Sequence, residues 1–301
     1  MDKPKAPEVS VVIPAYNEAE AIGTTIQEIK RLYPEFEVVV VDDGSTDNTA
    51  RIARESGARV VQHPYNIGNG AAVKTGIRAA SGKYVVLMDG DGQHAPEDIK
   101  RLLEPASHYD LVVGARSSKS QASLGRRIAN WCYNRLASYV GKFPIEDLTS
   151  GFRVFRRETV LKFLYLFPNT FSYPTTSTLA YLRSGLTIKY VPIEARRRVG
   201  KSKIRIFQDG SRFFLIILRI ATFFSPLRIF LPISAMFFLL GTGYYAYTFW
   251  TMHRFTNMSA LLLSVGIMIF LMGLISEQIT QLRYDRVEQQ DDVLGQRVIR
   301  D

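Results

Sequence analysis

A short apolar run that turns abruptly into a pair of carboxylates constrains this chain more than any other stretch of its sequence. The run covers residues 84–88 (YVVLM) and is followed by Asp89, Gly90 and Asp91. Its length and β-branched content predict a buried strand. Two carboxylates this close together repel each other unless a cation lies between them, and Mg²⁺ or Mn²⁺ bound together with substrate phosphates would supply that cation. The alternative interpretation is an ordinary Asp-Gly turn between a strand and a helix.

The first part of the chain alternates strand-like and helix-like segments, which predicts an α/β fold with a mostly parallel, doubly wound sheet covered on both faces. The predicted strands cover residues 9–13, 37–41, 59–62, 84–88 and 111–113, and helices are expected at 21–32, 52–55, 71–80 and 96–104. Polar clusters follow three of these strands. Because parallel strands end at the same edge of a sheet, we expect the clusters to meet there, where open α/β sheets bind ligands.

Several familiar signatures are missing from the sequence. It contains no G-x-G-x-x-G after the first strand, no G-x-x-x-x-G-K-[ST] and no G-x-S-x-G, which argues against dinucleotide-binding, P-loop and α/β-hydrolase proteins. Acidic strand ends instead suit a nucleotide held through its base, its ribose hydroxyls and a metal-bridged diphosphate. Asp43 could accept a hydrogen bond from the base or ribose, and Tyr16 could offer its ring edge or hydroxyl. The alternative for residues 16–18 is a turn followed by a helix cap.

Four segments taken together resemble a known family. They read VVIPAYNE at 11–18, VVDDGSTD at 40–47, GNGAAVKTG at 68–76 and MDGDGQH at 88–94. This set resembles family 2 glycosyltransferases with the GT-A (Rossmann-like) fold, and among them the polyprenyl-phosphate sugar synthases of the dolichyl-phosphate mannose synthase type. The resemblance covers the chain up to its apolar C-terminal part. It implies an enzyme, a hexosyltransferase that uses a nucleotide sugar such as GDP-mannose or a UDP-hexose.

The resemblance implies roles for individual residues at the strand ends. Counterparts of Asp89, Gly90 and Asp91 bind the diphosphate and the divalent cation, Mg²⁺ or Mn²⁺, and Gln93 would join the metal ligands. The nucleotide would be held by Pro14, Tyr16, Glu18, Val41 and Asp43. His94 has no such implied role, because a lone histidine at the edge of a loop is as readily a structural hydrogen-bonding group.

Three further segments carry implied roles near the diphosphate and the sugar. Arg116 follows the strand at 111–113 and would contact the donor diphosphate. Asp147 lies in a D-x-T-S-G-F-R element and is the candidate to orient a sugar hydroxyl or the acceptor. Arg197 and Lys203 lie in an R-x-x-G-x-S-K element and would close over the donor phosphates, although Val199 stands where the family has an aromatic residue. The alternative for this basic run is a patch that attracts anionic lipid.

The lipid acceptor is expected to meet a second set of polar residues. Arg126, Arg127 and Asn130 open an apolar helix, and guanidinium groups bind phosphate in a bidentate manner. Ser202 completes the predicted lipid-phosphate site, whereas the alternative for the arginines is ordinary solvated surface. A polyprenyl phosphate is already anionic near neutral pH, so the reaction needs positioning and charge neutralisation more than a strong base. Inversion at the anomeric carbon is implied by the resemblance alone.

Composition points to a membrane protein of a reducing compartment. The chain has 301 residues, a formal net charge of +10 and one cysteine, Cys132, so it cannot form an internal disulfide. The N-terminal segment lacks an apolar signal sequence, and we therefore expect the first domain to stay in the cytosol. A basic chain suits anionic lipid or phosphorylated substrates, and the apolar segments favour these partners over nucleic acid.

The sequence predicts four regions along the chain. A cytosolic GT-A domain covers 1–203, an amphipathic membrane-interface helix covers 204–225, a transmembrane hairpin of two helices covers 226–282, and a polar cytosolic tail covers 283–301. Cations flank the hairpin at its two ends, which places both ends in the cytosol. The alternative for the hairpin is a buried pair of helices in a soluble domain. The resemblance also implies a homo-oligomer, a tetramer.

Two other functions compete with sugar transfer to polyprenyl phosphate. A processive membrane polysaccharide synthase would share the first half of the chain, but the Q-x-x-R-W element of such enzymes does not occur here. A catalytically silent lipid-binding scaffold would retain the fold without the chemistry. The presence of Asp89, Asp91 and Arg197 argues against that alternative.

Overall fold

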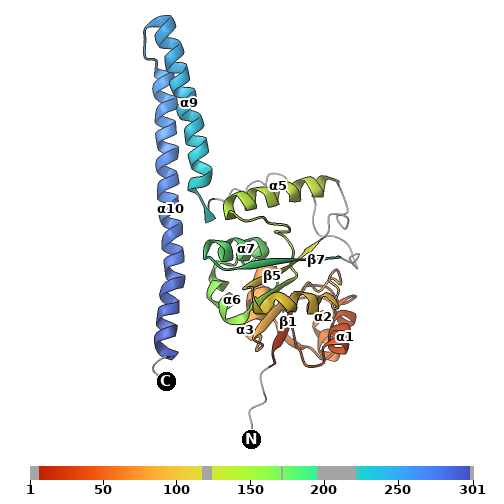
Figure 1. Ribbon diagram of the computed structural model, residues 1–301. Coiled ribbons are helices and arrows are strands. Elements are labelled where there is room, and N and C mark those ends of the chain that lie inside the picture. Colours follow the sequence, from red (N-terminus) through yellow and green to blue (C-terminus); the bar gives the residue numbers. More distant parts are fainter. Residues whose placement is uncertain (1–6, 117–123, 171, 195–221, 223, 299–301) are drawn as a thin grey trace. The chain divides into compact units, whose positions relative to one another are not determined.

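The computed structural model describes residues 7–116, 124–170, 172–194, 222 and 224–298, with the side chains of 124–130 and 283–298 left aside (Figure 1). The chain divides into two compact units, Met1–Ile204 and Arg205–Asp301. Most of the predicted amphipathic helix at 204–225 lies outside the described residues, so that prediction is not tested.

The first unit is built on a mostly parallel sheet of seven strands in the order β3-β2-β1-β4-β6-β5-β7, as expected for the predicted fold class. Only β6 runs against its neighbours, β4 and β5, whereas the other described pairs are parallel. The strands are β1 (Val9–Ala15), β2 (Glu37–Asp42), β3 (Arg59–Gln62), β4 (Tyr84–Leu87), β5 (Leu111–Arg116), β6 (Arg153–Arg156) and β7 (Ile188–Ile193). All residues of β1 and β4 are buried, which matches their continuous apolar sequence.

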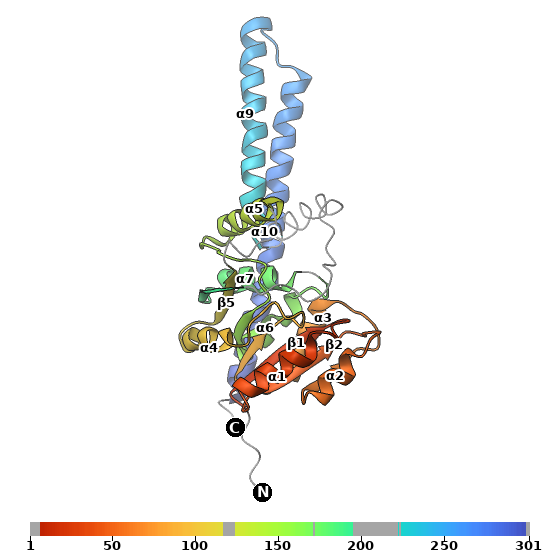
Figure 2. The same cartoon turned by 90° about the vertical axis from the view of Figure 1, so that its right-hand side faces the viewer.

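Helices cover both faces of this sheet. α1 (Ile22–Leu32), α2 (Thr49–Glu55) and α4 (Asp98–Leu103) share one apolar core with the side chains of Val11, Ile13 and Val40. α1 and α2 lie side by side at this face (Figures 1 and 2). α3 (Asn69–Ala79) packs on the opposite face, because the alternate strand residues Val12 and Val41 meet it.

The second half of the first unit contains elements that local sequence patterns do not predict. They comprise the short helices η1 (Glu104–Ser107) and η3 (Leu164–Leu166), and the helices α6 (Arg157–Phe163) and α7 (Tyr173–Arg183). In contrast, α5 (Leu124–Gly141) contains the apolar helix predicted to open at Arg126. α7 is polar in sequence yet almost wholly buried, from Tyr173 to Tyr181. This helix is therefore part of the interior that supports the sheet edge described below.

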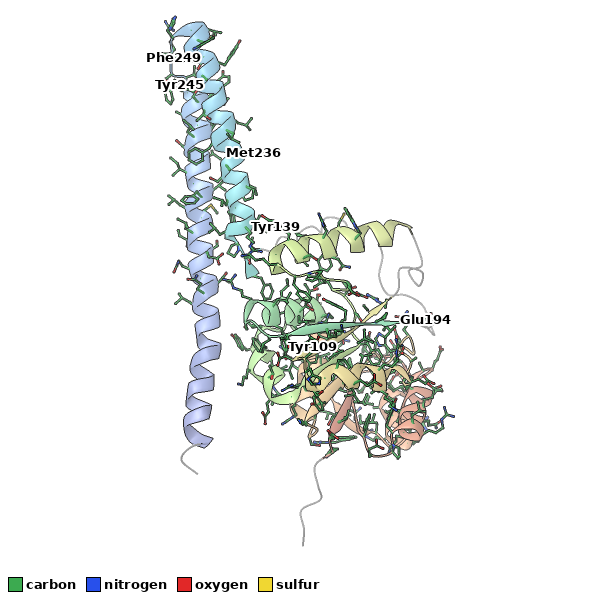
Figure 3. The ribbon with its side chains drawn as sticks, in the orientation of Figure 1. Tyr109, Tyr139, Glu194, Met236, Tyr245 and Phe249 are labelled. Carbon is green, nitrogen blue, oxygen red and sulfur yellow. The ribbon has the colours of Figure 1, made fainter. Side chains whose placement is uncertain are left out.

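The second unit is a helical hairpin of α9 (Leu227–Met252) and α10 (Asn257–Val298). Leu227–Met252 and Asn257–Leu282 are long and apolar enough to cross a membrane. Small residues bring the helices together: Ser234 Oγ donates to the Gly266 carbonyl at 2.8 Å, and a Cβ on Gly241 would lie 3.0 Å from Leu263. Tyr245 and Phe249 lie next to each other near the end of α9, with ring centroids 5.8 Å apart (Figure 3).

α10 is longer than the predicted span. The hairpin was expected to end at residue 282, but the helix continues through the polar segment to Val298. At the same open end of the hairpin, the backbone N–H of Leu227 donates to the Glu277 carboxylate at 3.3 Å. Because the first N–H groups of a helix have no partner within it, Glu277 caps α9 from the neighbouring helix.

The contact between α3 and the sheet generates a stability prediction. A Cβ on Gly76 would lie 2.2 Å from Cγ1 of Val12 and 3.1 Å from Cγ2 of Val41, so no side chain fits without moving the helix. We expect Gly76→Ala to lower the free energy of unfolding by about 1 to 3 kcal/mol, as other overpacked cores do. Thermal unfolding of the full chain in detergent measures the change.

Gly243→Ala is the matched control for this substitution. A Cβ on Gly243, in α9, would have no atom within 4 Å, and alanine also favours a helix over glycine. Equal unfolding temperatures for Gly76→Ala and the wild type would show that α3 can move away from the sheet at no cost.

Candidate active site

The polar clusters lie together at one edge of the sheet, as predicted. β1, β2, β4 and β5 point the same way, so the residues that follow them come to the same side: Tyr16, Asp43, Asp89 and, at the end of β5, Arg116. The segment 147–152, which precedes the antiparallel β6, enters the same edge between β4 and β5. Its position is fixed by the hydrogen bond of 2.9 Å from the Gly114 N–H to the Phe152 carbonyl.

The first two clusters are joined by hydrogen bonds between their loops. The backbone N–H of Asn17 donates to Ser45 Oγ at 2.9 Å, and Asn17 Oδ1 accepts from the Thr46 N–H at 2.8 Å. Asn17 adopts a φ of 54°, a left-handed conformation that asparagine tolerates better than most residues. The Glu18 N–H donates to Thr49 Oγ1 at 2.9 Å. These loops thus form one rigid corner at the ends of β1 and β2.

Asp43 has most of its hydrogen-bonding capacity occupied within the protein. Its Oδ1 is 2.7 Å from Nδ1 of His63 and accepts from the Ile67 N–H at 3.0 Å, while its Oδ2 accepts from the Gly68 N–H at 2.8 Å. The residue is only 2% exposed. An ionised carboxylate can accept about four hydrogen bonds, so Asp43 retains little capacity for a nucleotide. Its main contact is with the loop that follows β3.

Asp89 differs from Asp43 because its carboxylate remains available. Its side chain is 34% exposed, and no N–H or O–H donor among the described residues lies within hydrogen-bonding range of its oxygens. Nε2 of His94 is 3.9 Å from Oδ2, and burial lowers the pKa of His94, so this imidazole is neutral near pH 7. Asp89 therefore offers a ligand carboxylate oxygens that accept no hydrogen bond from the described residues.

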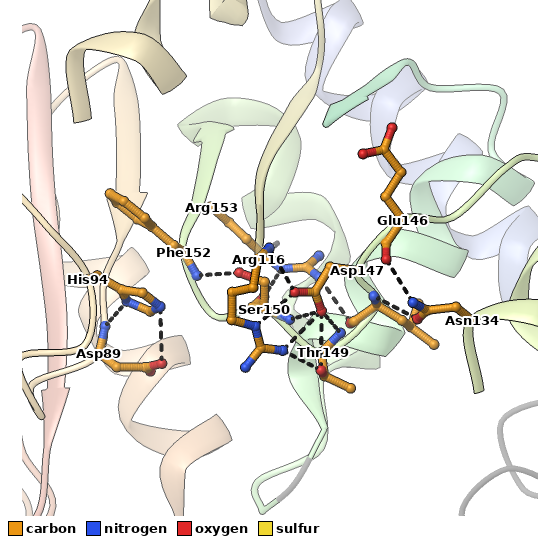
Figure 4. A network of polar contacts seen from close by, with 11 residues as sticks. Asp89, His94, Arg116, Asn134, Glu146, Asp147, Thr149, Ser150, Phe152 and Arg153 are labelled. Carbon is orange, nitrogen blue, oxygen red and sulfur yellow. Dashed lines mark hydrogen bonds and ion pairs between the residues drawn. The ribbon is translucent and has the colours of Figure 1, made fainter. Parts of the chain in front are cut away.

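His94 holds the backbone of this turn. The Asp89 N–H donates to Nδ1 of His94 at 3.2 Å, and the imidazole stacks on the ring of Phe152 with centroids 4.9 Å apart (Figure 4). His94 is buried, at 5% exposure. The structure therefore places this histidine as a structural hydrogen-bonding group, one of the two interpretations that the sequence allowed.

Gly151 lies directly against the Asp89 carboxylate. A Cβ at Gly151 would be 2.7 Å from Oδ2 of Asp89 and 3.0 Å from the hydroxyl of Tyr173. The Tyr173 hydroxyl donates to the Gly151 carbonyl at 3.3 Å from the buried start of α7. The absence of a side chain at position 151 is therefore what leaves room for Asp89 at this edge.

Arg116 and Asp147 form a bidentate ion pair (Figure 4). Nε of Arg116 donates to Oδ2 at 2.8 Å and Nη2 donates to Oδ1 at 3.0 Å, while Nη2 also donates to Thr149 Oγ1 at 2.6 Å. The Asp147 carboxylate additionally accepts from the backbone N–H groups of Arg116, Thr149 and Ser150. The hydrogen-bonding capacity of Asp147 is thus largely used to hold Arg116 and its own turn.

Part of Arg116 remains available for a ligand. No hydrogen bond from the described part of the chain reaches Nη1, and its side chain is 29% exposed. Burial works against the charged form, but Asp147 and then Asp89 outweigh it and raise the pKa of Arg116. This guanidinium is permanently charged and is close enough to Asp89 to feel its charge.

Arg153 anchors the other end of the 147–153 segment. It is fully buried and donates to Ser177 Oγ at 3.0 Å, to Thr178 Oγ1 at 2.8 Å and to the backbone carbonyls of Ser150 and Leu148. Burial lowers the pKa of Arg153 from its usual value. The hydrogen bonds from Arg153 explain why the sequence of α7 is polar, because the hydroxyls of this helix solvate the buried Arg153 cation.

The acidic residues at this edge fit a magnesium-type site. Among the described residues, no three carboxylate, imidazole or thiolate groups converge as they do in an all-protein metal site. Asp89 has free oxygens, Asp91 is 8% exposed, and Gln93 is half-buried beside them. The Gln93 N–H donates to Asp91 Oδ1 at 3.1 Å. One or two carboxylates that leave positions open for phosphate oxygens are what Mg²⁺ and Mn²⁺ use with nucleotides.

The remaining predicted site residues fall into three groups. Pro14, Val41 and Gly90 are buried within the sheet edge, and Val41 has no exposed surface, so these three support the site instead of presenting side chains. Tyr16 and Glu18 are half-buried. The predicted residues whose side chains lie outside the described part of the structure are Arg126, Arg127, Asn130, Arg197, Ser202 and Lys203.

The start of α3 does not offer a phosphate cradle, although its Gly-Asn-Gly sequence suggests one. The Gly70 N–H donates to the Thr170 carbonyl at 3.1 Å, and the Ala71 N–H donates to the Asn169 carbonyl at 2.8 Å. A Cβ on Gly70 would lie 2.0 Å from the Pro168 carbonyl oxygen. These glycines therefore admit another part of the chain, and the amides of Gly70 and Ala71 in the first turn of α3 are already bound.

Sequence reasoning missed several residues that shape the site. His63, Gly151 and Tyr173 contact Asp43 or surround Asp89, but each comes from a different part of the chain. His63 directly follows a predicted strand, and this position is the one signal that could have indicated it. Nothing in the local sequence of Tyr173 indicates its place.

Comparison with known proteins matches both units. The family model described as Glycosyl transferase family 2 matches residues 10–163, and the model described as GtrB C-terminal hairpin matches residues 225–282. A dolichyl-phosphate hexose transferase of Haloferax volcanii is 33% identical over 207 residues, which cover 68% of this chain and 90% of that protein. An undecaprenyl-phosphate mannosyltransferase of Micrococcus luteus is 32% identical over 216 residues, which cover 65% of this chain and 87% of that protein.

A solved structure shares the fold of the first unit. Glucosyl-3-phosphoglycerate synthase from Mycobacterium tuberculosis, determined with Mn²⁺, UDP and glucosyl-3-phosphoglycerate, superposes with a TM-score of 0.58 at 25% identity. The superposition covers 70% of this chain and 78% of that protein.

The ion pair at Asp147 generates a prediction about pH. Burial opposes ionisation of Asp147, but the hydrogen bonds and charge of Arg116 outweigh it and lower the pKa of this carboxyl. A depressed carboxyl pKa adds stability above the unfolded pKa of about 3.9, and that stability is lost as the pH falls through the folded pKa. We expect Asp147→Asn to cost about 3 kcal/mol of unfolding free energy at neutral pH.

The difference in the free energy of unfolding between Asp147→Asn and the wild type should disappear as acid protonates Asp147. Thermal unfolding of the full chain from neutral pH down to about pH 3 measures it, because the stabilisation begins to decrease where the carboxyl of the unfolded chain protonates, near its pKa of about 3.9. Asp98→Asn is the control, since Asp98 pairs with the half-exposed Arg101 at the protein surface and such pairs contribute little. A gap that stays constant down to the lowest pH would show that the charge of Asp147 does not stabilise the fold.

Proposed function

Because this chain belongs to glycosyl transferase family 2, we propose that it transfers one hexose from a nucleoside diphosphate sugar to a polyprenyl phosphate at a membrane surface. The observation that carries the proposal is the meeting of Asp89, Asp91 and Arg116 at one sheet edge in a chain with two candidate membrane spans. The names of the archaeal and bacterial relatives, which refer to dolichyl and undecaprenyl phosphate, support the acceptor class.

Asp89, Asp91 and Gln93 would hold a divalent cation, Mg²⁺ or Mn²⁺. When bound, the cation would neutralise the charge that develops on the leaving nucleoside diphosphate. The solved relative that was determined with Mn²⁺ and UDP supports this assignment. His94 and Gly151 would act on the site indirectly, because they fix the backbone and the carboxylate of Asp89.

Arg116 would bind the donor diphosphate through Nη1. Asp147 and Thr149 hold the other guanidinium nitrogens, so the side chain is oriented before the donor arrives. We therefore propose that Asp147 is a positioning residue for Arg116, which changes the role expected from its sequence. Arg197 and Lys203 would add positive charge over the same phosphates, as the family resemblance implies.

The transfer itself would need no strong general base. The acceptor phosphate is already anionic, and its oxygen would attack the anomeric carbon opposite the diphosphate, which inverts that centre. Arg126, Arg127, Asn130 and Ser202 would hold the acceptor phosphate. The oxygens of Asp147 are already occupied by hydrogen bonds, which is consistent with a reaction that requires no base at that position.

The proposed orientation places the first unit and both chain ends in the cytosol. Two spans return the chain to the side from which it started. Cations are concentrated before the first span and after the second, whereas Arg254 is the cation of the connecting loop. GDP-mannose is our first candidate for the donor, and a UDP-hexose such as UDP-glucose or UDP-N-acetylglucosamine is the second.

A transfer assay tests the proposed function directly. Detergent-purified protein receives labelled GDP-mannose, UDP-glucose or UDP-N-acetylglucosamine with polyprenyl phosphate and Mg²⁺ or Mn²⁺, and the label is followed into the organic phase. We expect label from one donor, loss of transfer with EDTA, and a decrease of at least about a hundredfold in Asp91→Ala, because that variant loses a metal-binding carboxylate.

Glu104→Ala, which removes an exposed carboxylate at the start of η1, is the control and should keep wild-type activity. Full activity of Asp91→Ala in the presence of metal would remove Asp91 from the metal site. No transfer from any donor by folded protein would favour the silent scaffold.

Arg127→Ala tests the proposed site for the acceptor phosphate. We expect this substitution to raise the KM for polyprenyl phosphate by about tenfold and to leave the KM for the nucleotide sugar within about twofold, because a bidentate contact to phosphate is lost. Arg78→Ala, an exposed arginine on α3, should change neither constant. An unchanged lipid KM in Arg127→Ala would place the acceptor phosphate elsewhere.

A further inference from the structure

His63 links two residues that are far apart in the sequence. Its Nδ1 is 2.7 Å from Oδ1 of Asp43, at the end of β2, and its Nε2 is 2.9 Å from Oγ1 of Thr75, in the middle of α3. The side chains of His63 and Asp43 are 9% and 3% exposed. The three side chains thus form a largely enclosed chain of hydrogen bonds from α3 to the sheet edge.

The direction of these hydrogen bonds follows from the chemistry of the partners. An ionised carboxylate can only accept, so Nδ1 of His63 carries a proton and donates it to Asp43. In the neutral imidazole, Nε2 is then an acceptor and receives the hydroxyl proton of Thr75. Asp43 therefore selects the tautomer of His63, and Thr75 holds the imidazole in place through its second nitrogen.

Asp43 transmits this orientation to the loop at 63–68. Its oxygens accept from the backbone N–H groups of Ile67 and Gly68, at 3.0 and 2.8 Å. The same loop packs on Gly44, where a Cβ would lie 2.5 Å from the carbonyl carbon of Tyr65. The loop therefore lies directly on the end of β2, and its position depends on how the Asp43 carboxylate is turned.

We propose that His63 is a positioning residue for nucleotide binding, which acts through Asp43 on the loop at 63–68. Thr75 supports it by fixing the imidazole. This inference rests on the proposed function, because it assumes that the nucleoside diphosphate of the donor binds at the ends of β1 and β2. The sequence-based assignment gave Asp43 a direct contact with the nucleotide, whereas here its contribution is largely the shape of the wall around it.

An order of carboxylate, imidazole and hydroxyl also occurs in nucleophilic triads, where the imidazole must reach both the nucleophile and the leaving group. The side chain of His63 is enclosed between its two partners, so it is poorly placed to deliver a proton to a substrate. A role in positioning therefore fits this arrangement better than a role in proton transfer.

Two substitutions at position 63 distinguish the effect of the hydrogen bond to Asp43 from the effect of side-chain size. The amide nitrogen of asparagine can lie where Nδ1 lies in histidine, whereas that of glutamine lies nearer to Nε2. We expect His63→Gln to raise the KM for the nucleotide sugar by about tenfold, with kcat and the lipid KM within about twofold. His63→Asn should keep the donor KM within about threefold of the wild type, because it retains the donor to Asp43.

Substitutions of Thr75 test the outer part of the chain of hydrogen bonds. Thr75→Val removes the hydroxyl at nearly the same volume and should raise the KM for the nucleotide sugar by about threefold. Thr75→Ser keeps the hydroxyl and should leave this KM near the wild-type value. Titration calorimetry with UDP and GDP measures nucleotide binding without transfer. The dissociation constant of whichever nucleotide the wild type binds should change in parallel with the donor KM.

Amide hydrogen exchange provides a readout that does not depend on activity. In full-length His63→Gln, the peptide that contains Ile67 and Gly68 should exchange faster than in the wild type, while peptides from β1 and β4 remain unchanged. His63→Asn should exchange nearly as the wild type does. The unfolding temperature of each variant shows whether a change is confined to this loop.

Two results would overturn the proposal. One is a His63→Gln variant with unchanged donor KM and unchanged exchange at the loop. The other is an equal loss in His63→Gln and His63→Asn together with a lower unfolding temperature, which would make His63 a general part of the core. If the wild type neither transfers sugar nor binds UDP or GDP, the proposed function fails together with the nucleotide role of His63, and the exchange data still decide whether His63 positions the loop.

Discussion

The ion pair between Arg116 and Asp147 is the contact on which the geometry of the site depends. It joins the end of β5 to a segment that passes against the Asp89 carboxylate at Gly151 and ends at the buried Arg153. The buried charges of Asp147 and Arg153 would be costly without partners, and here each takes part in several hydrogen bonds. One connected network therefore sets the distance between the carboxylates that would bind the metal and the guanidinium that would bind the diphosphate.

The acidic residues at the strand ends look alike in sequence, but the structure gives them different tasks. Asp43 and Asp147 accept hydrogen bonds from backbone and side-chain donors, so their charges are compensated inside the protein. Asp89 lacks such donors among the described residues and keeps its charge for a ligand. The number of internal donors around a carboxylate, instead of its place in a motif, separates supporting residues from those that can bind a cation.

Local patterns predicted the parallel strands β1, β2, β4 and β5 well, because each is a short run of buried and largely apolar residues bounded by turns. The region from β6 to β7 was not predicted: β6 is a four-residue strand with arginine at both ends, and α7 lacks apolar periodicity. Both depend on Arg153, whose partners lie up to 25 residues away. Likewise, Arg116 and Asp147 were assigned separate ligands because a pairing across 31 positions leaves no mark on either local sequence.

The closed N-terminus of α3 has a consequence for how the donor can be recognised. Many nucleotide-binding folds direct the positive end of a helix at the phosphates, which compensates part of their charge. Here that end of α3 is occupied by the carbonyls of Asn169 and Thr170. Compensation of phosphate charge is therefore left to mobile cations and to arginine and lysine side chains. Occupancy by a nucleotide sugar would then follow the free divalent-ion concentration of the compartment, so the supply of metal would set the rate at which this protein works.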